Sequence, residues 1–194
     1  SFETAQTEAV EEASRRVSPL TDEQRQLLAP MREWAHSAMH QADSKARAVL
    51  DWLESNLKDN GSWNEKRVIL FTEYRATLDW LHRILASHDF GGERLEILHG
   101  GVDHEDRERI KAAFQTNPEH SDVRILLATD AASEGIDLQN YCNYLIHLEI
   151  PYNPNVMEQR NGRIDRHGQK AKEVLIWHPV DADTSKDASH RRSC

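Results

Sequence analysis

A polar segment that begins at Asn153 carries the side chains best suited to bind a charged ligand. Asn153 can cap a helix and Pro154 suits its first turn, so we expect a helix that starts there. On this helix Gln159, Arg163 and Arg166 follow one another at steps of four and three residues, which places them on one face. Two guanidinium groups on one face form a donor surface suited to a polyphosphate. An exposed charged helix is the simpler explanation, but the few apolar residues here favour a face that binds a ligand.

A second candidate segment follows the most apolar run of the chain and reads Thr129-Asp130-Ala131-Ala132-Ser133-Glu134-Gly135-Ile136-Asp137. Gly135 permits backbone conformations that other residues resist. The Asp137 carboxylate can accept hydrogen bonds from ribose hydroxyls or orient an arginine. On local grounds alone, a loop that caps a helix explains this segment equally well.

Two shorter loops could also hold phosphate groups. They are Phe71-Thr72-Glu73-Tyr74 and His99-Gly100-Gly101, and each lies between an apolar run and an expected helix. Backbone amides at a helix N-terminus bind phosphates without any lysine. Each loop is a weak signal by itself, because a Thr after a strand is usually a turn and a Gly-Gly pair is usually a bend.

The elements that position these segments alternate between strand and helix. Short apolar runs, typical of buried strands, occur at 68–71, 95–98, 123–128, 144–150 and 174–177. Helical stripes lie between them, which implies right-handed crossovers and a parallel α/β sheet with helices on both faces. Ligands meet such sheets at the carboxyl ends of the strands, so functional residues are expected just after each run.

The first third of the chain is expected to be a helical extension. Apolar positions from Thr21 to His40 recur at three- and four-residue steps, and Thr21 with Gln24 resembles a capping box. A second helix is expected from Asp43 to Leu57, ended by Asn60 and Gly61, and no strand is expected before residue 66. The expected domains are a helical extension at 1–60, an α/β domain at 61–180 and a polar tail or linker at 181–194.

Composition limits what the chain can do. The formal net charge of -9 argues against a domain that holds nucleic acid through bulk positive charge, so any grip must be short and shared with another domain. No apolar stretch approaches the length of a membrane span, and no signal peptide is evident, which predicts a cytoplasmic protein. Cys142 and Cys194 suggest neither a disulfide framework nor a zinc ribbon. Because the chain begins with Ser1, we expect a piece of a longer polypeptide.

The candidate segments resemble the motifs of one protein superfamily. Gln159, Gly162, Arg163 and Arg166 look like motif VI of superfamily 2 helicases, and the segment from Thr129 to Asp137 looks like motif V. The loops at Thr72 and His99 resemble motif IV and the His-Gly turn that follows it, so the four motifs occur in the expected order. The longer string from Pro151 to Gln169 is similar to the RapA-like group of bacterial Swi/Snf-like translocases.

This resemblance implies a RecA-like lobe that completes, but does not contain, an ATP site. The chain has no Gly-x-x-x-x-Gly-Lys-Ser/Thr loop, and its Asp22-Glu23 pair begins a helix instead of following a strand. ATP with Mg²⁺ would therefore be bound mainly by a first RecA-like lobe of the same polypeptide, and the isolated chain is expected to be inactive. The implied partner is DNA, expected to be double-stranded. The implied roles are arginine fingers for Arg163 and Arg166, nucleotide contacts for Gly135, Asp137 and Gln159, and nucleic-acid contacts for Thr72, His99, Gly100 and Thr129.

Other classes of function remain open at this point. Ser133 lies in a segment that approximates the nucleophile elbow of a serine hydrolase, with His147, His167 and His178 as later histidines. A non-catalytic module that binds nucleic acid or protein is a more serious alternative. Metal binding by His36 and His40 is weakly indicated, because no third ligand is near. The sequence does not separate duplex unwinding from translocation, or DNA from RNA.

Overall fold

The computed structural model describes residues 12–14, 19–38, 41–130 and 138–180. The chain divides into two compact units, Ser1–Met39 and His40–Cys194. The first unit contains helix α2 (Asp22–Ala38). The predicted capping box is present, since the Thr21 amide donates to Gln24 Oε1 at 2.9 Å and the Gln24 amide donates to Thr21 Oγ1 at 3.3 Å. The helix expected from Thr21 is thus confirmed.

The second unit begins with helix α3 (Ser44–Leu57), whose first turn is capped by Asp43. Asp43 Oδ1 accepts a hydrogen bond from the Ala46 amide at 2.7 Å. The buried side of α3 packs into the same apolar cluster as the sheet. By its contacts α3 therefore belongs to the α/β unit, which begins at His40, although the expected helical extension at 1–60 included this helix.

A short hairpin follows α3 directly, and it corrects the prediction that no strand precedes residue 66. Strands β1 (Lys58–Asp59) and β2 (Ser62–Trp63) pair in antiparallel fashion. Asn60 and Gly61 form the turn between them with φ angles of 52° and 81°. Asn-Gly is the preferred pair for a hairpin turn that needs two positive φ angles. The sequence predicts that these two residues end the helix, but the helix ends at Leu57 and they form the turn of the hairpin instead.

A five-stranded parallel sheet forms the centre of the second unit, as predicted. The strand order is β4-β5-β3-β6-β7, and every pair of neighbours is parallel. The strands are β3 (Val68–Thr72), β4 (Leu95–Leu98), β5 (Ile125–Thr129), β6 (Tyr144–His147) and β7 (Leu175–Trp177). The helices between them are α4 (Arg75–Ser87), the 3-10 turn η1 (Gly92–Arg94), α5 (His104–Gln115) and α7 (Pro154–Asn161).

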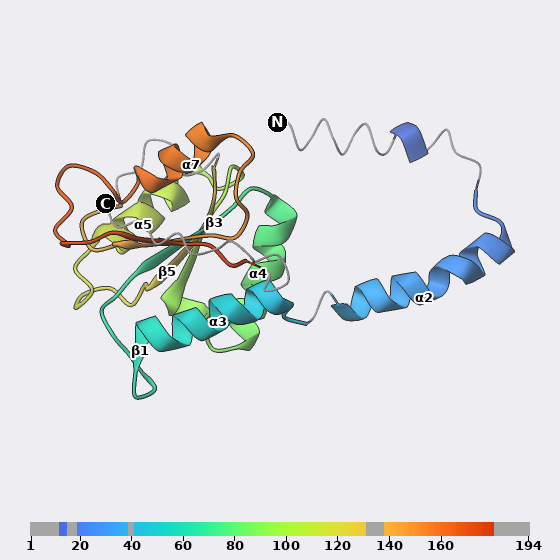
Figure 1. The fold of residues 1–194 in the computed structure, drawn as a ribbon, viewed down its shortest axis with the longest axis horizontal. Helices are drawn as coiled ribbons and strands as arrows, with labels where there is room; N and C mark the ends of the chain where they lie inside the picture. The colour runs from blue at the N-terminus through green and yellow to red at the C-terminus, as the bar shows by residue number, and fades with distance from the viewer. Residues whose placement is uncertain (1–11, 15–18, 39–40, 131–137, 181–194) are drawn as a thin grey trace. The chain divides into compact units, whose positions relative to one another are not determined.

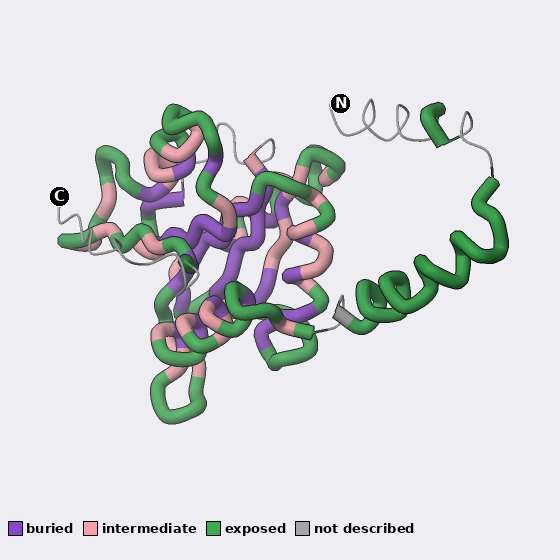
Figure 2. The backbone as a smooth tube through the Cα atoms, turned by 45° about the vertical axis from the view of Figure 1, so that its right-hand side comes forward, coloured by how far each residue is buried: buried purple, intermediate pink, exposed green. Residues whose placement is uncertain are grey.

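Helices cover both faces of this sheet, with α3 and α4 on one face and α5 and α7 on the other (Figure 1). Alternate residues of β3 point to opposite faces, which is the side-chain period of a strand. Val68 and Leu70 belong to the cluster that contains α3 and α4, whereas Ile69 and Phe71 belong to the cluster that contains α5. All residues of β3 and β5 are buried, and buried segments are purple on the tube in Figure 2. The apolar runs of these two strands are therefore buried on both faces.

The central position of β3 predicts a large loss of stability when its side chains are shortened. Leu70 is fully buried, and Leu70→Ala should lower the free energy of unfolding by about 2–5 kcal/mol, because it leaves a cavity in a close-packed layer. Leu175 on the edge strand β7 is 47% exposed, so Leu175→Ala should cost about 1 kcal/mol or less. Urea unfolding followed by tryptophan fluorescence measures both changes. Equal losses for the two variants would contradict this placement of the core.

Candidate functional site

The carboxyl ends of neighbouring strands bring polar residues side by side. Thr72, the last residue of β3, lies opposite Thr129 of β5, and Phe71 lies opposite His147 of β6. Asp130 follows β5 directly. This edge is where open parallel sheets bind ligands, because the loops that leave the strands converge there.

Helix α7 starts at this edge in the way the sequence predicts. Asn153 is its N-cap residue, with Oδ1 accepting a hydrogen bond from the Asn155 amide at 3.0 Å. Pro154 occupies the first helical position, where its missing amide hydrogen costs nothing.

The end of α7 corrects the prediction that Gln159, Arg163 and Arg166 share one helix face. The helix ends at Asn161, and Arg163 and Arg166 lie in the turns that follow. The Arg163 amide donates to the Arg160 carbonyl at 3.0 Å, a tighter turn than an α-helix makes. Glycine at position 162 is a poor helix former. The chain also has to deliver Ile164, which is fully buried, into the core beside α5.

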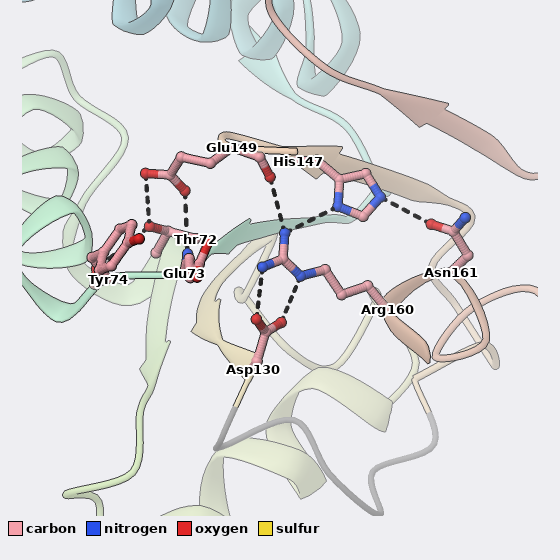
Figure 3. Close-up of polar contacts among 8 residues, drawn as sticks. All are labelled: Thr72, Glu73, Tyr74, Asp130, His147, Glu149, Arg160 and Asn161. Carbon is pink, nitrogen blue, oxygen red and sulfur yellow. Dashed lines mark hydrogen bonds and ion pairs between the residues drawn. The ribbon is translucent and has the colours of Figure 1, made fainter. Parts of the chain in front are cut away.

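A buried arginine holds α7 to the sheet. Arg160 is 1% exposed, and its Nε and Nη2 atoms donate to the two carboxylate oxygens of Asp130 at 2.5 and 2.7 Å (Figure 3). Its Nη1 atom donates to the Glu149 carbonyl at 3.1 Å. The guanidinium also lies over the Phe71 ring, 5.6 Å from its centroid. A buried charge is tolerated when it is paired and hydrogen-bonded in this way.

His147 fills the space between this arginine and the end of α7. Its Nδ1 atom lies 3.4 Å from Arg160 Nη1, and its Nε2 atom lies 2.9 Å from Asn161 Oδ1. Because arginine can only donate, Nδ1 must accept, and the ring proton is on Nε2, which donates to Asn161. Burial is the main cause that lowers the pKa of His147 to about 4; the hydrogen bond with Asn161 opposes this shift, and the positive charge of Arg160 contributes to it. The ring is thus neutral at physiological pH.

Glu149 connects the loop after β3 with this group. Its Oε1 atom accepts a hydrogen bond from the Thr72 hydroxyl at 3.3 Å, and its Oε2 atom accepts one from the Glu73 amide at 3.2 Å. Thr72 Oγ1 also lies 3.4 Å from the Tyr74 carbonyl. The interactions of Thr72, Glu149 and Arg160 form one continuous polar network (Figure 3).

The residues expected to contact nucleic acid differ in their accessibility. The side chain of Thr72 is fully buried, and that of Thr129 is 7% exposed. A direct contact from the Thr72 hydroxyl to a phosphate is therefore not available in this conformation, because Glu149 occupies it. Gly100 is exposed and His99 is half-buried, with its Nδ1 accepting from the Gly101 amide at 3.0 Å.

Three of the residues expected to face a nucleotide are described by the structure, and they lie on α7 or in the turns after it. Gln159 is exposed on the helix, and Arg166 is exposed in the following turns. Arg163 is half-buried, and its Nε atom is buried with no hydrogen-bond partner. Gly135 and Asp137 lie outside the described residues.

The alternative sites receive no support from the part of the chain that the structure describes. Ser133 lies outside the described residues, as does His40. Within the described ranges no group of three or more His, Cys, Asp or Glu side chains is arranged to hold a metal ion. None of the helices that the structure describes has the length and apolar character needed to cross a membrane.

Sequence reasoning missed the anchoring residues of this site. Arg160, Asp130 and Glu149 all lie within or beside the segments singled out, but none was assigned a role. The low apolar content of α7 favours a helix that faces a ligand, but it does not show how such a helix is held to the sheet. A helix without apolar anchors also needs some other attachment, and an arginine between the candidate residues is the signal that could have revealed it.

The buried ion pair predicts a loss of stability when one partner is neutralised. Asp130→Asn should lower the free energy of unfolding by about 2–4 kcal/mol, because it weakens the pairing of a buried guanidinium. This is less than a fully buried pair would lose, since the Asp130 side chain is 33% exposed. Asp122→Asn is the matched control: its pair with Arg94 is on the surface, and about 1 kcal/mol or less should be lost. Equal losses in urea unfolding would rule out a special role for the buried pair.

The depressed pKa of His147 predicts a pH-dependent stability. The folded protein holds the ring neutral down to about pH 4, whereas an unfolded histidine has the ordinary value of 6.5. Below pH 6.5 the unfolded state therefore binds the proton more tightly, and stability falls as the pH is lowered toward 4, by about 3 kcal/mol in all. His147→Gln should remove this part of the dependence, as measured by urea unfolding between pH 7.5 and 4.5. Parallel curves for wild type and variant would show that His147 does not titrate in this way.

Known proteins with similar sequences are helicases and related proteins. The chain is 33% identical over 145 residues to the uncharacterized ATP-dependent helicase YqhH of Bacillus subtilis (strain 168), covering 75% of this chain and 23% of that protein. It is 30% identical over 137 residues to the RNA polymerase-associated protein RapA of Pectobacterium carotovorum subsp. carotovorum (strain PC1), covering 71% of this chain and 13% of RapA. The chain thus spans less than a quarter of the length of either relative.

Solved structures with a similar fold are second lobes of such proteins. The C-terminal part of the Fun30 ATPase domain matches with a TM-score of 0.61 at 25% identity, covering 73% of this chain and 42% of that chain. Domain 2 of the DEAD-box helicase Mss116p, solved bound to an RNA duplex, matches with a TM-score of 0.56 at 19% identity, over 69% of this chain and 49% of that chain. The second likeness supports the RecA-like fold alone.

A family profile matches most of the α/β unit. The profile of the helicase conserved C-terminal domain matches residues 45–168, a span that runs from α3 to the turns after α7 and includes the polar network at the sheet edge. The chain therefore belongs to the helicase conserved C-terminal domain family, as the C-terminal RecA-like lobe of a superfamily 2 helicase of the Swi/Snf-like type.

Proposed function

We propose that this lobe completes the ATP site of a DNA translocase or helicase by supplying Arg163 and Arg166 as arginine fingers. ATP and Mg²⁺ are held mainly by a first RecA-like lobe of the same polypeptide, and the two lobes enclose the nucleotide between them. Arginine fingers neutralise the charge that develops on the transferred phosphoryl group.

The environment of Arg163 is the observation that carries this proposal. Its Nε atom is buried without a hydrogen-bond partner, and the described residues form no ion pair with its guanidinium. A buried donor without an acceptor costs about 1–3 kcal/mol, so native structures rarely keep one. An anionic group delivered from another lobe would satisfy the donor. None of the described residues thus serves as the partner of this Nε donor, and the proposed partner is an anionic group of the bound nucleotide.

The anchoring of α7 explains how a short polar helix can hold such fingers in place. Arg160 fixes the last turn of the helix to Asp130 and to the Glu149 carbonyl. Arg163 follows three residues later, and its own carbonyl accepts the Leu138 amide at 3.1 Å. The backbone from which the finger projects is therefore attached to the edge of the sheet through Arg160 and to the segment between β5 and β6 through Leu138. Catalytic positioning depends on supports of this kind.

Further nucleotide contacts are assigned to residues around the fingers. Gln159 is exposed on α7, four residues before Arg163. It is proposed to face the nucleotide together with Gly135 and Asp137, which lie outside the described residues. The chain contains no phosphate-binding loop of its own, so these contacts supplement those of the first lobe.

The nucleic-acid surface is proposed to run along the loops that follow β3, β4 and β5. The His99-Gly100 turn is the accessible part of this surface, since Gly100 is exposed. Thr72 and Thr129 lie at strand ends with buried side chains, so their proposed contribution is to shape the loops that follow. Duplex DNA is the proposed ligand. Closure of the lobes on ATP and reopening after hydrolysis would then move them along the DNA.

Removing either finger should abolish turnover without unfolding the lobe. In the polypeptide that carries both lobes, Arg163→Ala or Arg166→Ala should lower DNA-stimulated ATP turnover by about a thousandfold or more, because the transition-state charge loses its partner. Arg47→Ala, which removes an exposed arginine from α3, is the control and should leave turnover unchanged. Steady-state phosphate release measures all three.

Two results would count against this assignment. Turnover of both finger variants within about threefold of wild type would remove the catalytic role. Hydrolysis of ATP by residues 1–194 alone would show that the chain is not half of a divided site. Normal DNA binding by a wild-type polypeptide that hydrolyses no ATP would instead favour the non-catalytic binding module.

A further inference from the structure

We infer that Glu149 is a positioning residue that couples the arginine-bearing helix α7 to the nucleic-acid-facing loop after β3. This inference rests on the proposed function, and it assigns a role to a residue for which the motifs of the sequence gave none. Glu149 follows β6 and precedes the loop that leads to α7. It is therefore placed between the two segments that it would couple.

The side chain of Glu149 faces the loop after β3. Each carboxylate oxygen accepts from a different donor, Oε1 from the Thr72 hydroxyl at 3.3 Å and Oε2 from the Glu73 amide at 3.2 Å. These two donors are adjacent in the chain, and they are the hydroxyl and amide that a phosphate could otherwise have engaged. A carboxylate suits this place because it presents two acceptor oxygens and no donor. The contact fixes the position at which the loop leaves the sheet.

The same contact supports the start of α4. Tyr74 is the N-cap residue of α4, and no side-chain hydrogen bond caps the helix. The negative charge of Glu149 lies at the residue before this N-cap, where it interacts favourably with the positive end of the helix dipole. Glu149 does not cap the helix itself, but it fixes the residue before the N-cap from the segment that follows β6.

The backbone of Glu149 faces the opposite way, toward α7. Its carbonyl accepts from Arg160 Nη1 at 3.1 Å, and the same guanidinium is bound to Asp130. One residue therefore receives the anchor of α7 on its carbonyl and holds the loop after β3 with its carboxylate (Figure 3). A shift of α7 when Arg163 and Arg166, which follow it, engage the nucleotide must move Arg160, and through it residue 149 and the loop.

The chemical requirement for two acceptor oxygens leads to a sharp test. In the polypeptide that carries both lobes, Glu149→Gln keeps the size of the side chain but turns an amide donor toward one of the two donors. The stimulation of ATP turnover by duplex DNA should fall about tenfold, a usual size for coupling between two sites. The half-saturating ATP concentration should stay within about twofold of wild type, because Glu149 does not reach the nucleotide in this assignment.

A second variant keeps the test independent of folding defects. Thr72→Val removes the hydroxyl without changing the shape of the side chain and should also lower the stimulation by DNA. The double variant should lose no more of the stimulation by DNA than Glu149→Gln alone, because both substitutions break the same contact, that between the Thr72 hydroxyl and the Glu149 carboxylate. Glu93→Gln makes the same chemical change at an exposed site in η1 and should have no effect.

A direct measurement on the chain itself checks the contact. In residues 1–194, the Glu73 amide should exchange its hydrogen about tenfold faster in Glu149→Gln than in wild type, because its acceptor is lost. Unchanged exchange, or DNA stimulation equal to that of Glu93→Gln, would overturn the role of Glu149 and leave the proposed function intact. Absence of DNA-stimulated turnover in the wild-type polypeptide would overturn the proposed function itself.

Discussion

The pairing of Arg160 with Asp130 is the interaction on which the arrangement of the site depends. Arg160 is the buried residue of α7, and the helix offers the core little else. A guanidinium withdrawn from water requires a carboxylate and further acceptors, and Asp130, Glu149 and His147 supply them. Because these partners come from the ends of β5 and β6, the pair fixes α7 against the carboxyl edge of the sheet. The position of the helix is thus set by charge and geometry more than by apolar contact.

Buried arginines are a wider feature of this acidic chain. Arg67 and Arg124, near the amino ends of β3 and β5, are also buried and donate mainly to backbone carbonyls. Burial and, to a smaller extent, the nearby charge of Arg124 together lower the pKa of Arg67 to about 10, yet the group stays protonated at neutral pH. These cations are counted in the net charge of -9 but are not available on the surface. Phosphate binding by this lobe therefore depends on the cations that remain exposed, such as Arg166, and on backbone amides.

The sequence was sufficient to predict the sheet, because its apolar runs are buried on both faces and need no tertiary information to be recognised. It was also sufficient for the capped start of α7 at Asn153, which follows local rules. It failed where tertiary contacts decide. The end of α7 depends on the burial of Ile164, and the accessibility of Thr72 depends on Glu149, a residue 77 positions away. The hairpin at Asn60 was missed for a different reason: its strands have two residues each, too few to produce a pattern.

The early end of α7 strengthens the case for a finger at Arg163. In a continuous helix, Arg163 would share the orientation of Gln159 and would be held by helical hydrogen bonds alone. In the turn, its amide donates to the Arg160 carbonyl and its carbonyl accepts from Leu138, while its neighbours Arg160 and Ile164 are both buried. The backbone of Arg163 is therefore fixed from two sides before any ligand arrives. The backbone therefore contributes little to the conformational entropy lost when the side chain meets an anion, and a fixed point of attachment of this kind favours stabilisation of a developing charge.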